Sequence, residues 1–253
     1  LLEQALRAGA MGLTTSRTTK HRTADGRLTP SLSAQEAELT GLAQAMRRAG
    51  RGVLEVNSDF GPGEFKALRA ATEISGRPLS VLLLQVDNAP ELWCDTRAQI
   101  HAARAAGLSV NGQVGCRPIG VLIGLETSLH PFCTHPAWLA LSHLTPPERY
   151  RRLRADADLR RALVTERGSD EVTLRMQAAL PKMYVLDDDL DYEPAQSSSV
   201  AARAAAAARD PWDLVLELLM HREGKQLLLN TFENYNAANL DVVHELLTDD
   251  ATI

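Results

Sequence analysis

The sequence predicts an α/β fold, specifically part of a (β/α)₈ barrel of the TIM type with an insertion before its last strand. Strand-like runs begin near residues 11, 53, 79 and 108, and helical segments separate them. After the first step the spacing is roughly 25 to 30 residues, a typical βαβ length. Polar side chains follow several of these strands, as they do where barrels build their sites. A doubly wound sheet fits the spacing equally well.

Helix and strand signals alternate clearly in the first half of the chain. The segment "SAQEAELTGLAQAMRRAG" has Ser33 and Glu36 at capping-box spacing and ends at Gly50, which predicts a helix. "PLSVLLLQ" is almost continuously apolar, which is typical of a strand buried on both faces of a parallel sheet. The expected elements are, in order, a helix at 1–10, a strand from about 11, helix 33–50, strand 52–58, helix 62–76, strand 78–85, helix 88–107 (capped by Asn88 and Glu91) and strand 108–114.

The alternation stops after about residue 120, and the second half is mostly helical. We therefore expect three regions: barrel βα units at 1–127, a helical insertion at 128–225, and a return to the barrel at 226–253 with the last strand truncated. Within the insertion, Thr145, Pro146 and Glu148 start a helix, "KMYVL" is a short strand, and Asp210 with Pro211 starts another helix. "QLLLNTF" is a strand, "NLDVVHELLTDD" a helix, and the closing "ATI" the start of a strand.

Composition excludes several classes of function. The net charge of −5 is spread along 253 residues, so no basic patch indicates nucleic acid. No apolar run approaches the roughly 20 residues of a membrane span. The three cysteines are widely spaced and form no CxxC pair, which favours a reducing, cytoplasmic location. The chain begins inside a helical pattern and ends in a barely started strand, so we expect an internal piece of a longer protein.

Other segments with possible chemistry have ordinary structural interpretations. His130, Cys133 and His135 in "HPFCTH" suggest a metal, but their spacing matches no standard zinc pattern, and capped or stacked loop histidines are the alternative. "RYRRLR" is typical of a solvated helix face, and "DDDLDYE" of an exposed acidic loop. No GxGxxG, P-loop or GxSxG motif occurs, which weakens dinucleotide, nucleotide and serine-esterase assignments.

The strongest site signal is "TTSRTTKHRTADGRLTP", which follows the first strand. In a barrel this loop faces the pocket with Ser16, Arg17, His21 and Arg22. Arginine suits a two-point clamp on a substrate carboxylate, and Arg17 lies closest to the strand end. The alternatives are a loop whose hydroxyls satisfy its own backbone, and an Arg22 that braces the loop against Asp25.

The ends of later strands add to this substrate-binding group. Asn57 follows the second strand, and Arg117 follows the fourth. Because the carboxyl ends of all barrel strands meet on one face, we expect both side chains near the first loop.

The segment "ALRAGAMGLTTSRTTKHRTADG" resembles the "GAxGxSTSR…HR…DG" segment of the amidohydrolase superfamily, in its N-acyl-D-amino-acid deacylase (D-aminoacylase-like) branch. The similarity continues through "GVLEVNSDF", "SGRPLSVLLLQ", "CRPIGVLIGLETSLHPF" and "NYNAANLDVVHELL", and so spans nearly the whole chain. The resemblance implies a metal-dependent hydrolase barrel, a zinc or other divalent metal cofactor, and hydrolysis of a linear amide in an N-acyl-D-amino acid or related small molecule.

The resemblance also shows where this chain departs from the family. The HxH pair of the family's first strand would lie before residue 1, and the catalytic Asp just after Ile253, so the piece by itself is expected to be inactive. Where the family has histidines on two middle strands, this chain has Glu55 and either Leu84 or Gln85. Glu55 could ligate zinc through oxygen, whereas Leu or Gln is a poor substitute for imidazole. Either the metal is bound differently or one metal site is lost.

Two other functions stay open. One is a hydantoinase- or dihydroorotase-like enzyme that opens cyclic amides. The other is a non-catalytic, degenerate barrel that only binds acylated ligands, and the missing middle-strand histidines support it.

Overall fold

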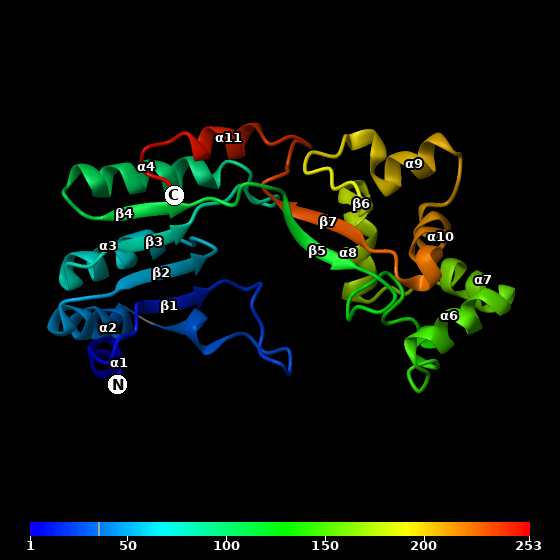
Figure 1. Cartoon of the computed structure of the whole chain (residues 1–253), viewed down its shortest axis with the longest axis horizontal. Helices are drawn as coiled ribbons and strands as arrows, with labels where there is room; N and C mark the ends of the chain where they lie inside the picture. Colours follow the sequence, from blue (N-terminus) through cyan, green and yellow to red (C-terminus); the bar gives the residue numbers. More distant parts are fainter. Residues whose placement is uncertain (35) are drawn as a thin grey trace. The chain divides into compact units, whose positions relative to one another are not determined.

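The computed structural model describes residues 1–34 and 36–253. It divides into two compact units: unit 1 comprises residues 1–116 and 241–253, and unit 2 comprises residues 117–240 (Figure 1). Each unit has its own cluster of buried apolar side chains. Within the described ranges, no helix combines the length and the apolar character that crossing a bilayer requires.

Unit 1 is built on a four-stranded parallel sheet with the strand order β1-β2-β3-β4 (Figure 1). Its strands are β1 (Gly12–Arg17), β2 (Val53–Ser58), β3 (Leu79–Leu82) and β4 (Val110–Gln113). Beyond β4, Thr252 forms a parallel bridge with Gly112. The Ile253 amide donates to the Gly112 carbonyl at 2.9 Å. The expected strand start in "ATI" is therefore present, next to β4.

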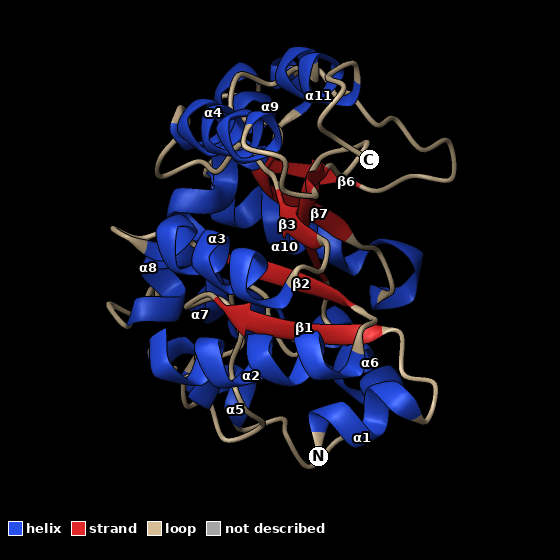
Figure 2. Ribbon diagram, turned by 90° about the vertical axis from the view of Figure 1, so that its left-hand side faces the viewer, coloured by secondary structure: helices blue, strands red, loops and turns tan. Residues whose placement is uncertain are grey.

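The helices of unit 1 pack on one face of this sheet. They are α1 (Leu2–Arg7), α2 (Glu36–Ala49), α3 (Glu64–Ser75), α4 (Leu92–Ala105) and α11 (Asp241–Leu247), with a 3₁₀ turn, η1 (Pro30–Ser33), before α2. Figures 1 and 2 show α2, α3 and α4 side by side along the sheet. Their apolar residues share a single cluster with alternate strand residues, including Leu54, Val56, Leu79, Val81 and Val110. Right-handed crossovers between strands added in one direction place every helix on the same side.

The alternation of strand and helix that the sequence predicts in this half is confirmed, and the chain is an α/β protein. The helix expected at 33–50 runs from Glu36 to Ala49, and residue 35 lies outside the described residues. Gly50 follows it with a left-handed φ of +69°. The expected cap of the helix at 88–107 is wrong in detail. Glu91 occupies the N-cap position of α4, but its side chain makes no capping hydrogen bond.

Unit 2 combines a small antiparallel sheet with a layer of helices. The sheet has the order β5-β7-β6, with β5 (Ile119–Ile123), β6 (Met183–Val185) and β7 (Leu228–Glu233). The helices are α5 (Pro136–Leu139), α6 (Pro146–Ala155), α7 (Ala157–Thr165), α8 (Glu171–Ala179), α9 (Val200–Ala206) and α10 (Pro211–Gly224), with 3₁₀ turns η2 (Leu180–Lys182) and η3 (Gln196–Ser198). The capping box of Thr145 and Glu148 and the Asp210 cap are confirmed.

The boundaries of unit 2 differ from the insertion expected at 128–225. Its strand β5 lies within the region assigned to the barrel, and β7 pairs with β5 and β6 instead of joining the parallel sheet. Both strands are short apolar runs, and such a run predicts a buried strand without specifying its partner. Long-range pairing of residues 119–123 with residues 228–233 decides the division.

Candidate functional site

The face of the parallel sheet away from the helices carries a row of polar side chains. Side chains alternate between the two faces of a strand, so the neighbours of the core residues Leu54 and Val56 point to the opposite face. The strand register places four residues side by side across that face: Thr14, Glu55, Ser80 and Asn111. One step nearer the carboxyl ends of the strands, Ser16 lies beside Asn57. This face therefore presents hydrogen-bonding groups where its opposite face is apolar.

Ser16 and His21 contact each other at the carboxyl end of β1. The Ser16 Oγ lies 2.5 Å from the His21 Nδ1. Ser16 is half-buried at the strand end, and His21 is exposed on the loop that follows. Asn57 is half-buried on the neighbouring strand, and its side chain makes no hydrogen bond in the described part of the chain. Asn57 is the register partner of Ser16, so its amide lies on the same face of the sheet as the Ser16 hydroxyl.

Arg17 holds the far end of the loop that follows β1. Its guanidinium forms a two-point ion pair with the Glu64 carboxylate in the first turn of α3, and both side chains are mostly buried. The Nη1 atom also donates to the carbonyls of Ser31 at 3.1 Å and Ala34 at 2.9 Å. These contacts tie the chain before α2 to the start of α3.

Asp59 holds the near end of the same loop. Its carboxylate accepts from the Thr18 hydroxyl at 2.5 Å, the Thr19 amide at 2.8 Å and the Thr19 hydroxyl at 2.9 Å. Burial acts to raise the pKa of Asp59, but the hydrogen bonds from Thr18 and Thr19 outweigh burial and keep this pKa below its usual range. The carboxylate therefore stays ionised at neutral pH and fixes residues 18 and 19 beside β2.

The position of Arg17 favours a role in supporting the loop over the predicted carboxylate clamp. Arg17 has the same strand parity as Leu13, which packs against the core cluster, so its side chain points to the helix side. Ser16 points to the other face. The alternation "LTTSR" after Gly12 contains this signal, and the sequence interpretation missed it because it treated both residues as part of the loop.

The remaining predicted substrate residues, Arg22 and Arg117, belong to different units. Arg22 is exposed, and its backbone bridges to Leu28. The expected brace between Arg22 and Asp25 is wrong, since Arg27 pairs with Asp25 at 2.7 Å. Arg117 is exposed and is the first residue of unit 2.

The two tentative metal ligands differ in their surroundings. Glu55 is exposed in the middle of the polar row, next to Thr14 and Ser80. Gln85 is buried after β3 and already has a polar interaction. The row around Glu55 offers hydroxyl and amide groups but no imidazole, which is a poor ligand set for zinc.

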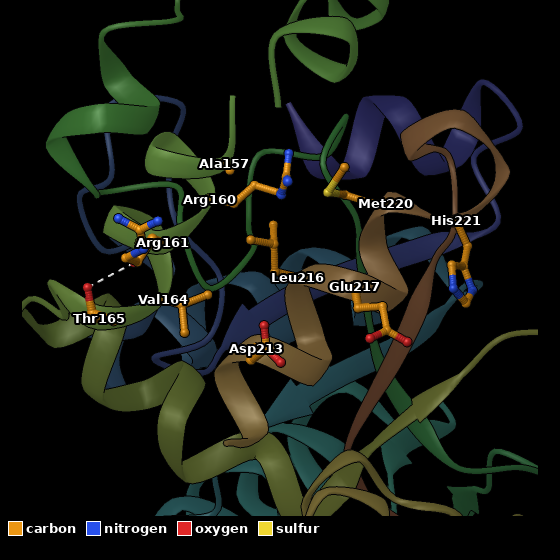
Figure 3. A pocket seen from close by; sticks show the side chains of 10 residues that line it. All are labelled: Ala157, Arg160, Arg161, Val164, Thr165, Asp213, Leu216, Glu217, Met220 and His221. Carbon is orange, nitrogen blue, oxygen red and sulfur yellow. Dashed lines mark hydrogen bonds between the residues drawn. The ribbon is translucent and has the colours of Figure 1, made fainter. Parts of the chain in front are cut away.

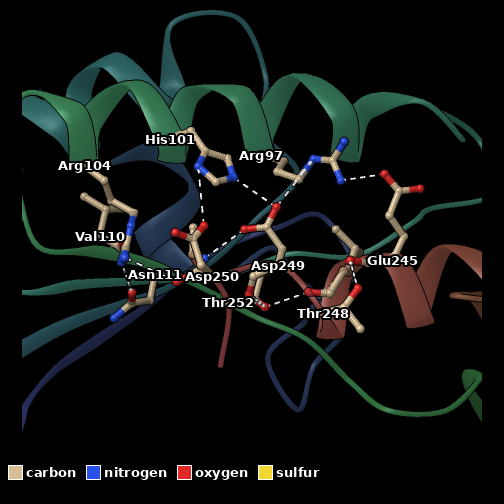
Figure 4. A network of polar contacts seen from close by, with 12 residues as sticks. Arg97, His101, Arg104, Val110, Asn111, Glu245, Thr248, Asp249, Asp250 and Thr252 are labelled. Atoms are coloured by element: carbon tan, nitrogen blue, oxygen red, sulfur yellow. Dashed lines mark hydrogen bonds and ion pairs between the residues drawn. The ribbon is translucent and has the colours of Figure 1, made fainter.

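A group of possible metal ligands lies at the opposite end of the sheet. Among the described residues, His101, Asp249 and Asp250 bring ligand atoms within 4.8 Å of one another (Figure 4). The His101 Nε2 bonds to Asp249 at 2.9 Å, and Arg97 bonds to Glu245 at 2.6 Å. These contacts fasten α11 and the segment after it to α4, at the amino ends of the strands. Because these side chains already bond to one another across two elements, we assign His101, Asp249 and Asp250 a structural role.

The histidines of "HPFCTH" are structural. His130 is buried, and its ring contacts Trp138 edge-on, with 4.6 Å between the ring centres. Burial and, to a smaller extent, the charge of Arg149 lower the pKa of His130 to about 4, which keeps it neutral. His135 is the N-cap of α5: its Nδ1 accepts from the Ala137 amide at 3.1 Å, and its Nε2 bonds to the Glu166 carbonyl at 3.0 Å. The stacked and capped alternatives are thus both confirmed.

A groove of about 560 Å³ lies between α7 and α10 in unit 2 (Figure 3). Val164, Leu216 and Met220 give it an apolar floor. Its acidic residues already have partners, because Arg209 pairs with Asp213 at 2.6 Å and with Glu217 at 2.7 Å. By volume alone, this groove is the better candidate for a ligand-binding site. By its group of polar side chains, the carboxyl end of β1 and β2 is the better candidate.

Comparison of the chain with protein-family models, with curated proteins and with solved structures returned no match.

Proposed function

We propose that this chain supplies the substrate-binding side of a hydrolase that cleaves a linear amide, specifically the acyl–nitrogen bond of an N-acyl-D-amino acid or a related small molecule. The observation that carries the proposal is the polar face of the parallel sheet, with Ser16 and Asn57 at the carboxyl ends of adjacent strands. Hydroxyl and amide side chains at this position suit an amide ligand, which both donates and accepts hydrogen bonds. The resemblance of residues 5–26 to N-acyl-D-amino-acid deacylases supports the choice of substrate.

Part of a (β/α)₈ barrel is the architecture we infer for unit 1. A doubly wound sheet has helices on both faces, whereas the helices of unit 1 pack on one face. The strands also follow one another in chain order, and a fifth position begins beside β4 at Thr252. Both features are typical of an arc of a barrel. The three free cysteines support the cytoplasm as the compartment.

The residues present do not fit a zinc site at the carboxyl end of this sheet. Glu55 offers one carboxylate among hydroxyl and amide neighbours, and Gln85 is already engaged. We therefore assign no catalytic step to a metal held by this chain. Its own residues bind and orient the ligand: Asn57 and Ser16 bond to the acyl group, and the Glu55 carboxylate accepts from the amide N–H.

A substrate panel on the full-length protein, with zinc supplied, tests the proposal. We expect turnover of N-acetyl-D-amino acids but not of hydantoins or dihydroorotate. Asn57→Ala should raise KM roughly tenfold, the value of one to two hydrogen bonds. The matched control is Gln99→Ala, which removes an exposed amide from α4 on the helix side of the same sheet. Turnover of the cyclic amides alone would replace this proposal with the ring-opening one.

A non-catalytic binding protein is the second candidate function. The poor ligand set around Glu55 favours it, since an acyl ligand can be held there without metal chemistry. Tight binding of an N-acyl-D-amino acid, measured by calorimetry, with no product formed in the presence of zinc would select this candidate.

A further inference from the structure

We propose that Ser16 and His21 form a nucleophile–base pair that accepts an acyl group from an activated ester or amide without a metal. The proposal relies on the proposed function only for the class of ligand, an acyl compound bound at the carboxyl ends of β1 and β2. It gives Ser16 a covalent role beyond binding the acyl group, and it assigns a catalytic role to His21, which the proposed function does not use.

The contact between the two side chains has the geometry of an activated hydroxyl. The distance of 2.5 Å between the Ser16 Oγ and the His21 Nδ1 is well within hydrogen-bond reach. With the ring proton on Nε2, Nδ1 accepts the hydroxyl proton, so the imidazole can act as general base. The exposure of His21 leaves the pair accessible to a ligand.

The loop is held independently of this contact. Arg17 and Glu64 secure one end, and Asp59 binds Thr18 and Thr19, which lie between Ser16 and His21 in the chain. The bond between Ser16 and His21 is therefore not needed to give the loop its path. A rigid support on both sides instead keeps the hydroxyl and the imidazole in contact, as preorganised catalytic groups require.

Asn57 supplies a hydrogen-bond donor beside the nucleophile. It is the register partner of Ser16 on β2, and both belong to the face away from the helices. Adjacent strands lie about 4.8 Å apart. The Asn57 amide on β2 can therefore reach the oxygen of an acyl group attached to Ser16 on β1. The Asn57 amide group has no side-chain partner within residues 1–34 and 36–253, so it is available to an oxyanion.

The proposed reaction has an acylation step and a hydrolysis step. The Ser16 Oγ attacks the carbonyl carbon of the acyl compound, and its proton moves to the His21 Nδ1. The bond from that carbon to the leaving oxygen or nitrogen breaks, and the leaving group takes the proton from His21. Water then gives a proton to His21 and its hydroxide to the acyl carbon, and Ser16 recovers its proton as the acid departs.

The test uses the full-length protein after treatment with EDTA, with p-nitrophenyl acetate as the probe. We expect a burst of about one p-nitrophenol per chain, and one acetyl group on the peptide containing Ser16 by mass spectrometry. Ser16→Ala should abolish the burst, and His21→Gln should slow it at least a hundredfold. Asn57→Ala should slow it less, by roughly tenfold or more.

Control variants separate this reaction from general surface acylation. His143→Gln removes an exposed histidine, and Ser33→Ala an exposed serine, and both should leave the burst unchanged. The unfolding midpoints of all variants should match that of the unmodified protein, because the Arg17–Glu64 ion pair and the hydrogen bonds of Asp59 remain in each of them. An unchanged burst in Ser16→Ala, or acetyl groups mapped elsewhere, would overturn the proposal. Turnover of N-acyl-D-amino acids is measured separately with zinc present, so each proposal can fail without the other.

Discussion

The histidines of two short segments, the loop after β1 and residues 130–135, have opposite surroundings. In the loop after β1, charged residues secure the backbone, and His21 is an exposed side chain next to a hydroxyl. In residues 130–135, both histidines are themselves structural supports, one stacked in the core of unit 2 and one capping α5. Burial and hydrogen-bond partners, and not the number of histidines in a segment, therefore decide whether an imidazole is available for chemistry.

The largest expected effect comes from removing the ion pair that secures the loop after β1. Glu64→Ala leaves the Arg17 guanidinium mostly buried without its carboxylate, so we expect a loss of about 3 kcal/mol in the free energy of unfolding. Urea denaturation measures this loss. Glu73→Ala is the matched control, because it breaks an exposed pair with Arg69 on the same helix and should change little. Equal effects from both variants would show that the loop is not held by Arg17.

A pH dependence distinguishes the buried histidine of unit 2. His130 has a pKa of about 4 in the folded protein and about 6.5 when unfolded. Folding therefore favours the neutral ring. Its contribution is complete above pH 6.5 and is lost as the pH falls toward 4, by up to about 3 kcal/mol.

His130→Phe should remove this part of the pH dependence, since phenylalanine cannot take a proton. The measurement is the urea midpoint of the variant and the unmodified protein at pH 7 and pH 4.5. His143→Gln, at an exposed position, should keep the full decline. A variant at residue 130 that loses as much stability on acidification as the unmodified protein would contradict the assignment.

The smallest effects compare one histidine from each segment. His135→Ala removes the N-cap of α5 and the bond to the Glu166 carbonyl, so it should cost about 1 to 2 kcal/mol. His21→Ala removes an exposed ring from a loop that other residues already hold in place. It should change the free energy of unfolding by less than about 0.5 kcal/mol. Thermal unfolding of the two variants in parallel checks the difference. A larger loss for His21→Ala would mean that its bond to Ser16 supports the loop.

Local sequence signals determined the alternation of elements. Helix starts such as Thr145 with Glu148 and Asp210 with Pro211 depend on atoms within one turn, so they could be predicted without the fold. Apolar runs likewise identified β2, β3 and β7 as strands. The alternation in "LTTSR" also places Ser16 and Arg17 on opposite faces of the sheet.

The tertiary structure decided which strands pair and which side chains contact each other. β7 pairs with β5 more than a hundred residues earlier in the chain, and Arg17 finds Glu64, 47 residues away. An apolar run or an arginine has many possible partners, and only the packing of the core selects one of them. The contact between Ser16 and His21 depends on the same selection, because it requires the loop path that Asp59 and Glu64 impose from other elements.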